Sequence, residues 1–492
     1  MLKQTYLPAV ATILFIAAVR VGAQTIDCGC ETATLPAVWA KLNGKGIGEA
    51  DVEKTVLSQV AKLQSQVIDL RKDQLDILIN SHLIELEAAK LKLTPDQILE
   101  KEVTAKAKVP SDADVEAYFN TKKQELESQA GRTVTLAEVK EPIRNYLSQQ
   151  NAQDRAKAYA EQLKASYGVK KLVEEAAVPK APADRLKVLA TIGTYGIRSD
   201  DVEKSLRPVV YATQTAVYGA RKEAIDEFVN DSLLTAEATK RGVDPKVLLD
   251  TEVDKKVPTI TDEAAQTFFN QNKSRITGDF AGLKAQIVQY MQNQEREKLE
   301  KAFADRLRAA AQIEYLLPPP IPPVYSIDLT DRPVMGAPGA PVTIAAYVDF
   351  QCPTCAEFHA TLLRVVQESK GRVRLVFLNY PLNQHKDARK AAEAAEAARE
   401  QGKFWEYADL LYKNQSDLSI AKLKALARSL GMDGAKFDTA LDSGKFAGLV
   451  DQQERAGDAI GVNATPTIFI NGRPVDAYNY DDLKKAVDAA KP

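Results

Sequence analysis

Residues 342–355, Val-Thr-Ile-Ala-Ala-Tyr-Val-Asp-Phe-Gln-Cys-Pro-Thr-Cys, decide the fold of the C-terminal third of this chain. The first seven are almost all apolar, which is typical of a buried strand. Cys352 and Cys355 form a C-x-x-C pair, and apolar residues at helical spacing follow from Phe358. The pair therefore lies where a strand leads into a helix. The free N–H groups and the positive end of the helix dipole stabilise a thiolate at this position.

The sequence on either side of this stretch predicts the rest of a small α/β domain. A second strand is expected over Arg372–Tyr380, helical segments over Ala388–Leu441, and a last helix from Asp482. Asn471-Gly472 lies between two short apolar runs and is a type I′ hairpin signal. The order β-α-β, helices, β-β-α predicts a thioredoxin fold with a helical insertion over residues 327–492.

The cysteine pair is interpreted as a dithiol. Pro353 fits the first helical position, where a missing N–H costs little. Cys352 is expected to attack a substrate disulfide and Cys355, one turn further on, to resolve the mixed disulfide. The competing interpretation is half of a zinc site, but no second C-x-x-C or Cys-His pair follows. Asp349 is expected to be structural, and neither His359 nor His385 is given a catalytic role.

Three motifs of this region resemble DsbA-type thiol–disulfide oxidoreductases. They are the segment from Ala340 to Cys355, Gln401-Gly-Lys-Phe-Trp-Glu406, and Gly461-Val-Asn-Ala-Thr-Pro-Thr-Ile-Phe-Ile-Asn-Gly472. The resemblance implies a cis Pro466 facing the cysteines, with Thr465 offering backbone groups to the substrate as an added strand. Position 354 is Thr, where the strongest oxidants of the family carry His. The direction of the reaction, as oxidase, reductase or isomerase, therefore stays open.

The N-terminus resembles a targeting signal. Lys3, an apolar run over residues 7–19 and a small-residue exit at residues 21–23 match a secretory signal peptide. The run is too short for a comfortable membrane helix, so an uncleaved anchor is the weaker alternative. Cys28-Gly29-Cys30 follows in an arm that we expect to have no essential role. A local disulfide, a metal clip and an exchange partner for Cys352 are its alternatives.

Residues 41–316 contain an internal repeat. Gly46-Ile47 and Asp51-Val52-Glu53-Lys54 return 150 residues later as Gly196-Ile197 and Asp201-Val202-Glu203-Lys204. Further matches include Asp76 with Asp226 and Asn80 with Asn230 and, after a six-residue slip, Ile143 with Ile287 and Tyr146 with Tyr290. Apolar residues within each copy recur at helical spacing, and the last helix of each is expected over Leu136–Leu147 and Phe280–Met291. His82 is expected on a helix surface. The fold class is therefore an all-α duplicated region followed by the α/β thioredoxin-like domain.

Each copy resembles the helical module of SurA-type chaperones. The resemblance rests on a long helix ending in an E-A-x-x-x-x-x-x-x-P pattern, an aromatic Tyr-Phe or Phe-Phe, and a last helix beginning Thr135-Leu-Ala-Glu-Val. In that family a prolyl isomerase domain lies between the helices, and here the gap is far too short for one. The resemblance therefore implies client holding or dimerisation, not prolyl isomerisation.

Residues 318–323, Pro-Pro-Pro-Ile-Pro-Pro, end the helical region as a semi-rigid spacer that is expected to keep the two parts separated. The predicted organisation is a signal peptide (1–23), an N-terminal arm (24–40), two helical modules (41–178 and 187–316), a proline-rich linker (317–326) and the thioredoxin-like domain (327–492).

The composition narrows the functional classes. The 492 residues carry a formal charge of −2, which leaves no basic surface of the kind that nucleic acid requires. The leading hypothesis is an exported thiol–disulfide oxidoreductase that needs no cofactor or metal. Its partners would be unfolded or cysteine-containing exported proteins and a membrane or soluble redox partner, with homo-oligomer formation left open. The alternatives are a periplasmic chaperone or scaffold with a non-essential redox site, and a metal carrier, which lacks enough soft ligands.

Overall fold

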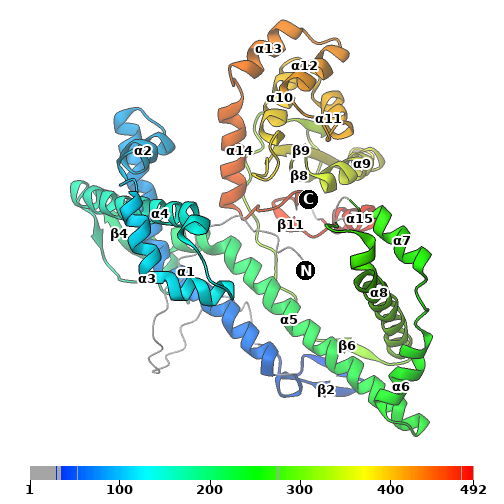
Figure 1. Ribbon diagram of the computed structural model, residues 1–492. Coiled ribbons are helices and arrows are strands. Elements are labelled where there is room, and N and C mark those ends of the chain that lie inside the picture. Colours follow the sequence, from blue (N-terminus) through cyan, green and yellow to red (C-terminus); the bar gives the residue numbers. More distant parts are fainter. Residues whose placement is uncertain (1–28, 30–34, 53, 274–275, 478, 491–492) are drawn as a thin grey trace.

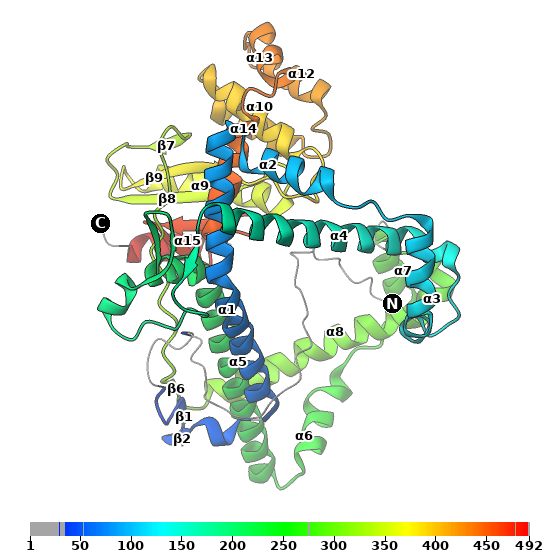
Figure 2. The same cartoon turned by 90° about the vertical axis from the view of Figure 1, so that its left-hand side faces the viewer.

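The computed structural model describes residue 29 and residues 35–52, 54–273, 276–477 and 479–490. A mainly helical region extends to about residue 317, and an α/β domain follows it (Figures 1 and 2). Both parts have the predicted predominant structure. The predicted signal peptide (1–23), Cys28 and Cys30 lie outside the described residues.

The helical region contains the same succession of elements twice. The first copy consists of β1 (Ala40–Leu42), β2 (Lys45–Ile47), α1 (Lys54–Leu91), α2 (Pro95–Glu102), α3 (Asp112–Ala130), α4 (Leu136–Ser166) and β3 (Lys170–Lys171). The second consists of β4 (Val188–Ile192), β5 (Tyr195–Arg198), α5 (Ser199–Arg241), α6 (Pro245–Glu252), α7 (Asp262–Gln271), α8 (Phe280–Ala309) and β6 (Ile313–Tyr315). Helices α4 and α8 extend well beyond the predicted ends at Leu147 and Met291. The residues that follow are mostly Ala, Gln, Glu, Lys and Arg, which favour helix.

Two small antiparallel sheets interlock the copies, and the sequence pattern does not predict them. The last strand of the second copy, β6, pairs with β1 of the first, and β3 pairs in the same way with β4 of the second copy. The strands are only two to five residues long, too short for a period-2 alternation to be recognised. The β4–β5 hairpin also covers α1, where His82 stacks on Tyr195 with ring centroids 4.0 Å apart. His82 lies on α1, as expected, and is half-buried against the hairpin.

The copies also share their hydrophobic cores. One core joins buried residues of α1 to buried residues at the start of the second copy: Leu75, Ile79, Leu83, Ile197 and Val202. Another joins the start of the first copy to the far end of α5 and to the linker: Trp39, Ile47, Ile225, Val229 and Leu317. Helices α1 and α5 lie side by side as the spine of the region (Figures 1 and 2). The two repeats are consecutive in sequence, but each is folded onto the other.

One aspartate in each copy ties the last helix to the long helix. Asp226 of α5 accepts a hydrogen bond from Arg308 of α8 at 2.7 Å and another from the Tyr315 hydroxyl of β6. Asp76 of α1 forms the corresponding ion pair with Lys164 of α4 at 3.5 Å. The repeated Asp76 and Asp226 therefore reflect a shared anchoring contact.

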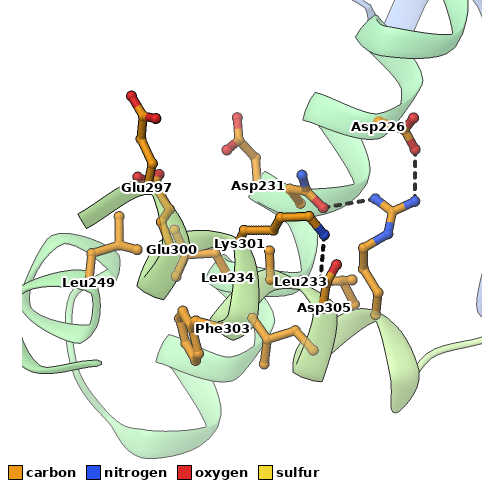
Figure 3. A pocket seen from close by; sticks show the side chains of 14 residues that line it. Asp226, Asp231, Leu233, Leu234, Leu249, Glu297, Glu300, Lys301, Phe303 and Asp305 are labelled. Carbon is orange, nitrogen blue, oxygen red and sulfur yellow. Dashed lines mark hydrogen bonds and ion pairs between the residues drawn. The ribbon is translucent and has the colours of Figure 1, made fainter. Parts of the chain in front are cut away.

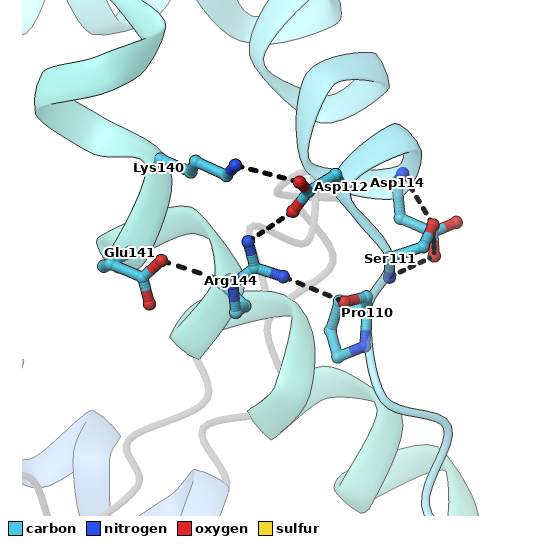
Figure 4. Close-up of polar contacts among 7 residues, drawn as sticks. All are labelled: Pro110, Ser111, Asp112, Asp114, Lys140, Glu141 and Arg144. Atoms are coloured by element: carbon cyan, nitrogen blue, oxygen red, sulfur yellow. Dashed lines mark hydrogen bonds and ion pairs between the residues drawn. The ribbon is translucent and has the colours of Figure 1, made fainter.

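The middle elements of each copy form an arm, α3–α4 in the first and α7–α8 in the second. The arms stand apart in Figure 1 and extend in the same direction in Figure 2. Figure 4 shows how the first arm is closed: Asp112 of α3 accepts hydrogen bonds from Arg144 at 2.6 Å and Lys140 at 3.0 Å. Asp262 and Lys284 form the matching pair at 2.6 Å in the second arm. Both arms are thus held by an equivalent contact.

The α/β domain is built on a five-stranded sheet with the order β11-β10-β8-β9-β7. Strands β8 and β9 are parallel, and the other pairs are antiparallel. The elements are β7 (Val334–Gly336), β8 (Val342–Val348), α9 (Pro353–Glu368), β9 (Val373–Asn379), α10 (Ala388–Glu400), α11 (Phe404–Lys413), α12 (Ile420–Ser429), α13 (Gly434–Asp442), α14 (Ala447–Ala459), β10 (Thr467–Ile470), β11 (Arg473–Val475) and α15 (Tyr480–Ala489). Asn471 and Gly472 have φ of 48° and 77°, as a type I′ turn requires. The sequence prediction lacks the short edge strand β7, and its helical segments end at Leu441, before α14.

The proline-rich linker does not hold the two parts separated, so that expectation is wrong. Leu317 is buried in a core of the helical region and Tyr325 in a core of the α/β domain. The α/β domain also contacts α5, where Gly461 packs on Pro208. A Cβ at Gly461 would lie 2.7 Å from the Cβ of Pro208. The two parts meet because both ends of the linker are buried and a glycine allows this close approach.

We expect Asp226→Ala to lower the free energy of unfolding by about 1–3 kcal/mol, because Arg308 and Tyr315 lose their shared acceptor. Urea unfolding followed by circular dichroism measures the change. The control is Asp231→Ala on the same helix. Asp231 forms no ion pair or hydrogen bond within the described residues, so the change should stay below about 0.5 kcal/mol. Equal losses in the two variants would contradict the anchoring role.

Candidate active site

Cys352 ends the loop after β8 and is the N-cap residue of α9, with φ −73° and ψ 119°. Its N–H donates to the carbonyl of Asp349 at 3.2 Å, which closes the turn. Pro353 occupies the first turn of the helix, and Pro353 and Thr354 are both exposed. Cys352 and Cys355 are free thiols, 6% and 2% exposed. The cysteines thus have the predicted placement, with the second thiol more deeply buried than the first.

A second segment, distant in sequence, meets Cys352. The Thr465–Pro466 peptide bond is cis, as the family resemblance implied. The sulfur of Cys352 lies 3.3 Å from the carbonyl oxygen of Thr465. The structure therefore brings together Cys352, Cys355, Thr465 and Pro466, the residues that the motifs singled out.

The two thiols lie in opposite electrostatic environments. A hydrogen bond from the Cys355 side chain lowers the pKa of Cys352 to about 5. Burial raises the pKa of Cys355 above its usual range. At pH 7 a pKa of about 5 gives roughly 99% thiolate, against about 3% for an ordinary cysteine. The pair is therefore a thiolate beside a protonated thiol, which is the arrangement that thiol–disulfide exchange uses.

Asp349 precedes the cysteines in the same loop and connects this loop to the one after β9. Its side chain is fully buried and accepts hydrogen bonds from the N–H of Gln351 at 2.6 Å and of Leu382 at 2.8 Å. The same carboxylate lies 2.7 Å from the Nδ1 of His385. These contacts fit the structural role expected for Asp349. Through His385 and Leu382, Asp349 links the loop after β9 to the loop that carries the cysteines.

Gln415 also contacts the site, although no sequence motif singles it out. Its amide nitrogen donates to the carbonyl of Phe350 at 2.8 Å and to that of Cys352 at 2.9 Å. Gln415 lies in the loop after α11, about 60 residues from the cysteines, and belongs to no recognisable motif. It holds the backbone of the cysteine loop from the side of the helical insertion.

His359 is buried on α9 and has a partner in the insertion. Its Nε2 lies 2.7 Å from the Oδ1 of Asp409, and its ring packs on Tyr412 with centroids 4.8 Å apart. Burial lowers the pKa of His359. These contacts attach the insertion to α9 and give His359 a packing role.

Metal and membrane features can be assessed only where the chain is described. In that part, no group of three or more His, Cys, Asp or Glu residues could hold a metal ion. None of the helices in the same ranges is both long enough and apolar enough to cross a membrane.

Comparison with known proteins agrees with the fold of this domain. Residues 329–489 match the family described as Thioredoxin, so the C-terminal part of the chain is a thioredoxin-like domain, as predicted. The Na(+)/H(+) antiporter NhaA 3 of Salinispora tropica is 40% identical over 159 residues, which are 32% of this chain and 24% of the antiporter. The chain thus spans about a quarter of that relative's length.

A second curated relative, Disulfide bond formation protein D of Bacillus subtilis, is 28% identical over 169 residues. The match covers 32% of this chain and 76% of that protein. Among solved structures, oxidised BdbD from Bacillus subtilis is similar with 26% identity and a TM-score of 0.32, covering 34% of this chain and 97% of that one.

The lowered pKa of Cys352 predicts selective alkylation of the reduced protein. Labelling by iodoacetamide should require the thiolate, so its rate should be constant above about pH 6 and should fall as the pH decreases through about 5. Peptide mapping by mass spectrometry should place the label on Cys352. An inflection near the ~8.5 of a free cysteine, or first labelling of Cys355, would show that the assignment is wrong.

Proposed function

We propose that this protein is an exported thiol–disulfide oxidoreductase whose dithiol is Cys352-Pro353-Thr354-Cys355. The observation that carries the proposal is the pairing of a low-pKa Cys352 at the start of α9 with a buried, protonated Cys355. The matched thioredoxin family and the relative named for disulfide bond formation support it. The predicted signal peptide at residues 1–23 is the basis for proposing export.

The reaction proceeds through a mixed disulfide. The Cys352 thiolate attacks one sulfur of a substrate disulfide, the S–S bond breaks, and the other substrate sulfur leaves as a thiolate. Cys355 then loses its proton and attacks the Cys352 sulfur, which releases the second substrate thiolate. The substrate is reduced and Cys352–Cys355 becomes the disulfide; the reverse sequence oxidises a substrate dithiol. A membrane or soluble redox partner restores the starting state.

Substrate backbone is proposed to bind beside Thr465 and Pro466. The Thr465 carbonyl lies within 3.3 Å of the Cys352 sulfur, so a peptide bonded to Thr465 would bring its cysteine to the attacking thiol. Thr354 is exposed beside the pair and offers only a hydroxyl, so it does not assign the direction of the reaction.

The helical region is proposed to hold unfolded clients near the dithiol. Each arm carries a partly exposed aromatic pair: Tyr118–Tyr146 with centroids 5.3 Å apart, and Phe268–Tyr290 at 5.5 Å. Tyr146 and Tyr290 occupy equivalent positions of the repeat, and their side chains are exposed to a similar extent, 43% and 50%. Rings of this kind suit contact with apolar side chains. Client holding is favoured over dimerisation because the pairing of two modules is already made within one chain.

A second candidate function is a holdase chaperone or scaffold with a non-essential redox site. The two arms, which extend in the same direction from a shared spine, favour it (Figure 2). The two candidates differ in whether the cysteines are required for activity on proteins.

Cys355→Ala should trap mixed disulfides between Cys352 and exported proteins, because the resolving thiol is gone. Non-reducing electrophoresis before and after dithiothreitol would detect them. Cys352→Ala, which leaves the buried thiol alone, is the matched control and should trap none. Absence of adducts under oxidising conditions would favour the holdase candidate.

Removal of the helical region should separate chemistry from client holding. A chain beginning at Pro322 should keep its disulfide exchange rate on a short peptide. It should lose about tenfold or more on a reduced unfolded protein, because tethering raises the local client concentration. The rates of disulfide exchange on both substrates are measured for the truncated and the full-length protein and compared. Equal rates on both would leave the helical region without the proposed role.

A further inference from the structure

A pocket opens between α5, α6 and α8 in the second helical copy, with a volume of about 570 Å³ (Figure 3). Leu234, Leu249 and Phe303 give it an apolar lining. Acidic side chains from α5 and α8 also line it, and Figure 3 shows the carboxylates of Asp231 and Glu297 directed away from the apolar groups. The pocket therefore combines an apolar interior with a negative rim.

Among the described residues, the negative charge of the rim is only partly neutralised. Two of the lining acids are paired, Asp226 with Arg308 and Asp305 with Lys301, each at 2.7 Å. In contrast, neither Asp231 nor Glu297 forms an ion pair with any described residue. Within the described part of the chain, Glu300 pairs only with Arg296, at 3.4 Å and with both side chains nearly half exposed, a contact that contributes little in water.

The first copy allows a comparison within the same chain, because three of the five lining acids have no acidic counterpart there. In the repeat register, Ser81, Gln153 and Ala156 take the places of Asp231, Glu297 and Glu300. Leu83 is fully buried in a continuous core that includes Tyr159, whereas its counterpart Leu233 is only half-buried. In the second copy this core is divided into two clusters.

The module therefore folds without these acids, and folding gives no reason for placing three carboxylates around exposed apolar surface. An apolar side chain inserted in the pocket would leave neighbouring parts of the ligand at the rim. Lys or Arg in those parts would meet unpaired carboxylates at the edge of a low-dielectric surface, where attraction is stronger than in open water. An acidic ligand would be repelled.

We propose that this pocket binds a segment of a client polypeptide in which a large apolar side chain lies next to Lys or Arg. Charge complementarity and the apolar interior select this occupant. The proposal rests on the client-holding part of the proposed function and gives the second helical copy a preference that the first copy lacks. It does not involve the dithiol.

The test measures binding of a fluorescein-labelled peptide, Gly-Leu-Lys-Phe-Arg-Leu-Gly, to the full-length protein by fluorescence anisotropy. An analogue with Glu in place of Lys and Arg probes the role of charge without any change to the protein. We expect the basic peptide to bind at least tenfold more tightly than the acidic one. Its affinity should fall as salt is raised, because the rim is exposed.

The variant Asp231→Ser, Glu297→Gln, Glu300→Ala places the first copy's residues in the pocket and should weaken the basic peptide about tenfold. The control variant Glu100→Gln, Glu116→Gln, Asp154→Asn removes the same charge from the first copy and should change affinity by less than about twofold. None of these six residues is buried, so both variants should fold, as thermal unfolding would verify.

Equal affinity for the basic and acidic peptides, or equal losses in the two variants, would overturn the proposal. Disulfide exchange with a small peptide disulfide is measured on the same samples. Inactive cysteines with intact peptide discrimination would reject the redox function alone, and active cysteines without discrimination would reject the pocket alone.

Discussion

The hydrogen bond between the side chains of Cys355 and Cys352 is the interaction on which the chemistry depends. It lowers the pKa of one thiol to about 5, while burial raises that of the other, so two identical groups acquire different roles. The surrounding structure preserves this difference. The cysteines follow strand β8 at the start of α9. Asp349 accepts a hydrogen bond from the loop after β9, and Gln415 of the helical insertion donates one to the backbone carbonyl of Cys352.

The helical region contains the same arrangement of elements twice, and the two copies are joined by strand pairing. Each copy gives its last strand to the other's hairpin, so neither copy completes its sheet alone. A shared spine of α1 and α5 supports two arms of similar construction. The surfaces of the two copies differ, because residues at equivalent positions of the repeat differ. The α/β domain rests against α5 at Gly461 and Pro208, which places the dithiol domain and the spine in direct contact.

Residues that act through local spacing were predictable from the sequence. The C-x-x-C pair after a strand, the Thr465-Pro466 element before a hairpin and the 150-residue repeat all leave marks that a single chain reveals. Contacts that depend on tertiary structure leave none. The position of Gln415 has meaning only once α11 packs beside α9, and the exchange of β3 and β6 concerns strands of two or three residues. Pro318–Pro323 ends the helical pattern in the sequence, but such a break does not imply separation in space, because Leu317 and Tyr325 are both buried.

The reduction potential of the full-length protein tests the central claim most directly. The protein would be equilibrated in glutathione buffers of known potential, its free thiols alkylated, and the oxidised fraction of Cys352 and Cys355 determined by mass spectrometry. A thiolate stabilised in the reduced form predicts one two-electron transition between about −270 and −120 mV, the range of known exchange proteins. A midpoint below about −300 mV, as for structural disulfides, would contradict it.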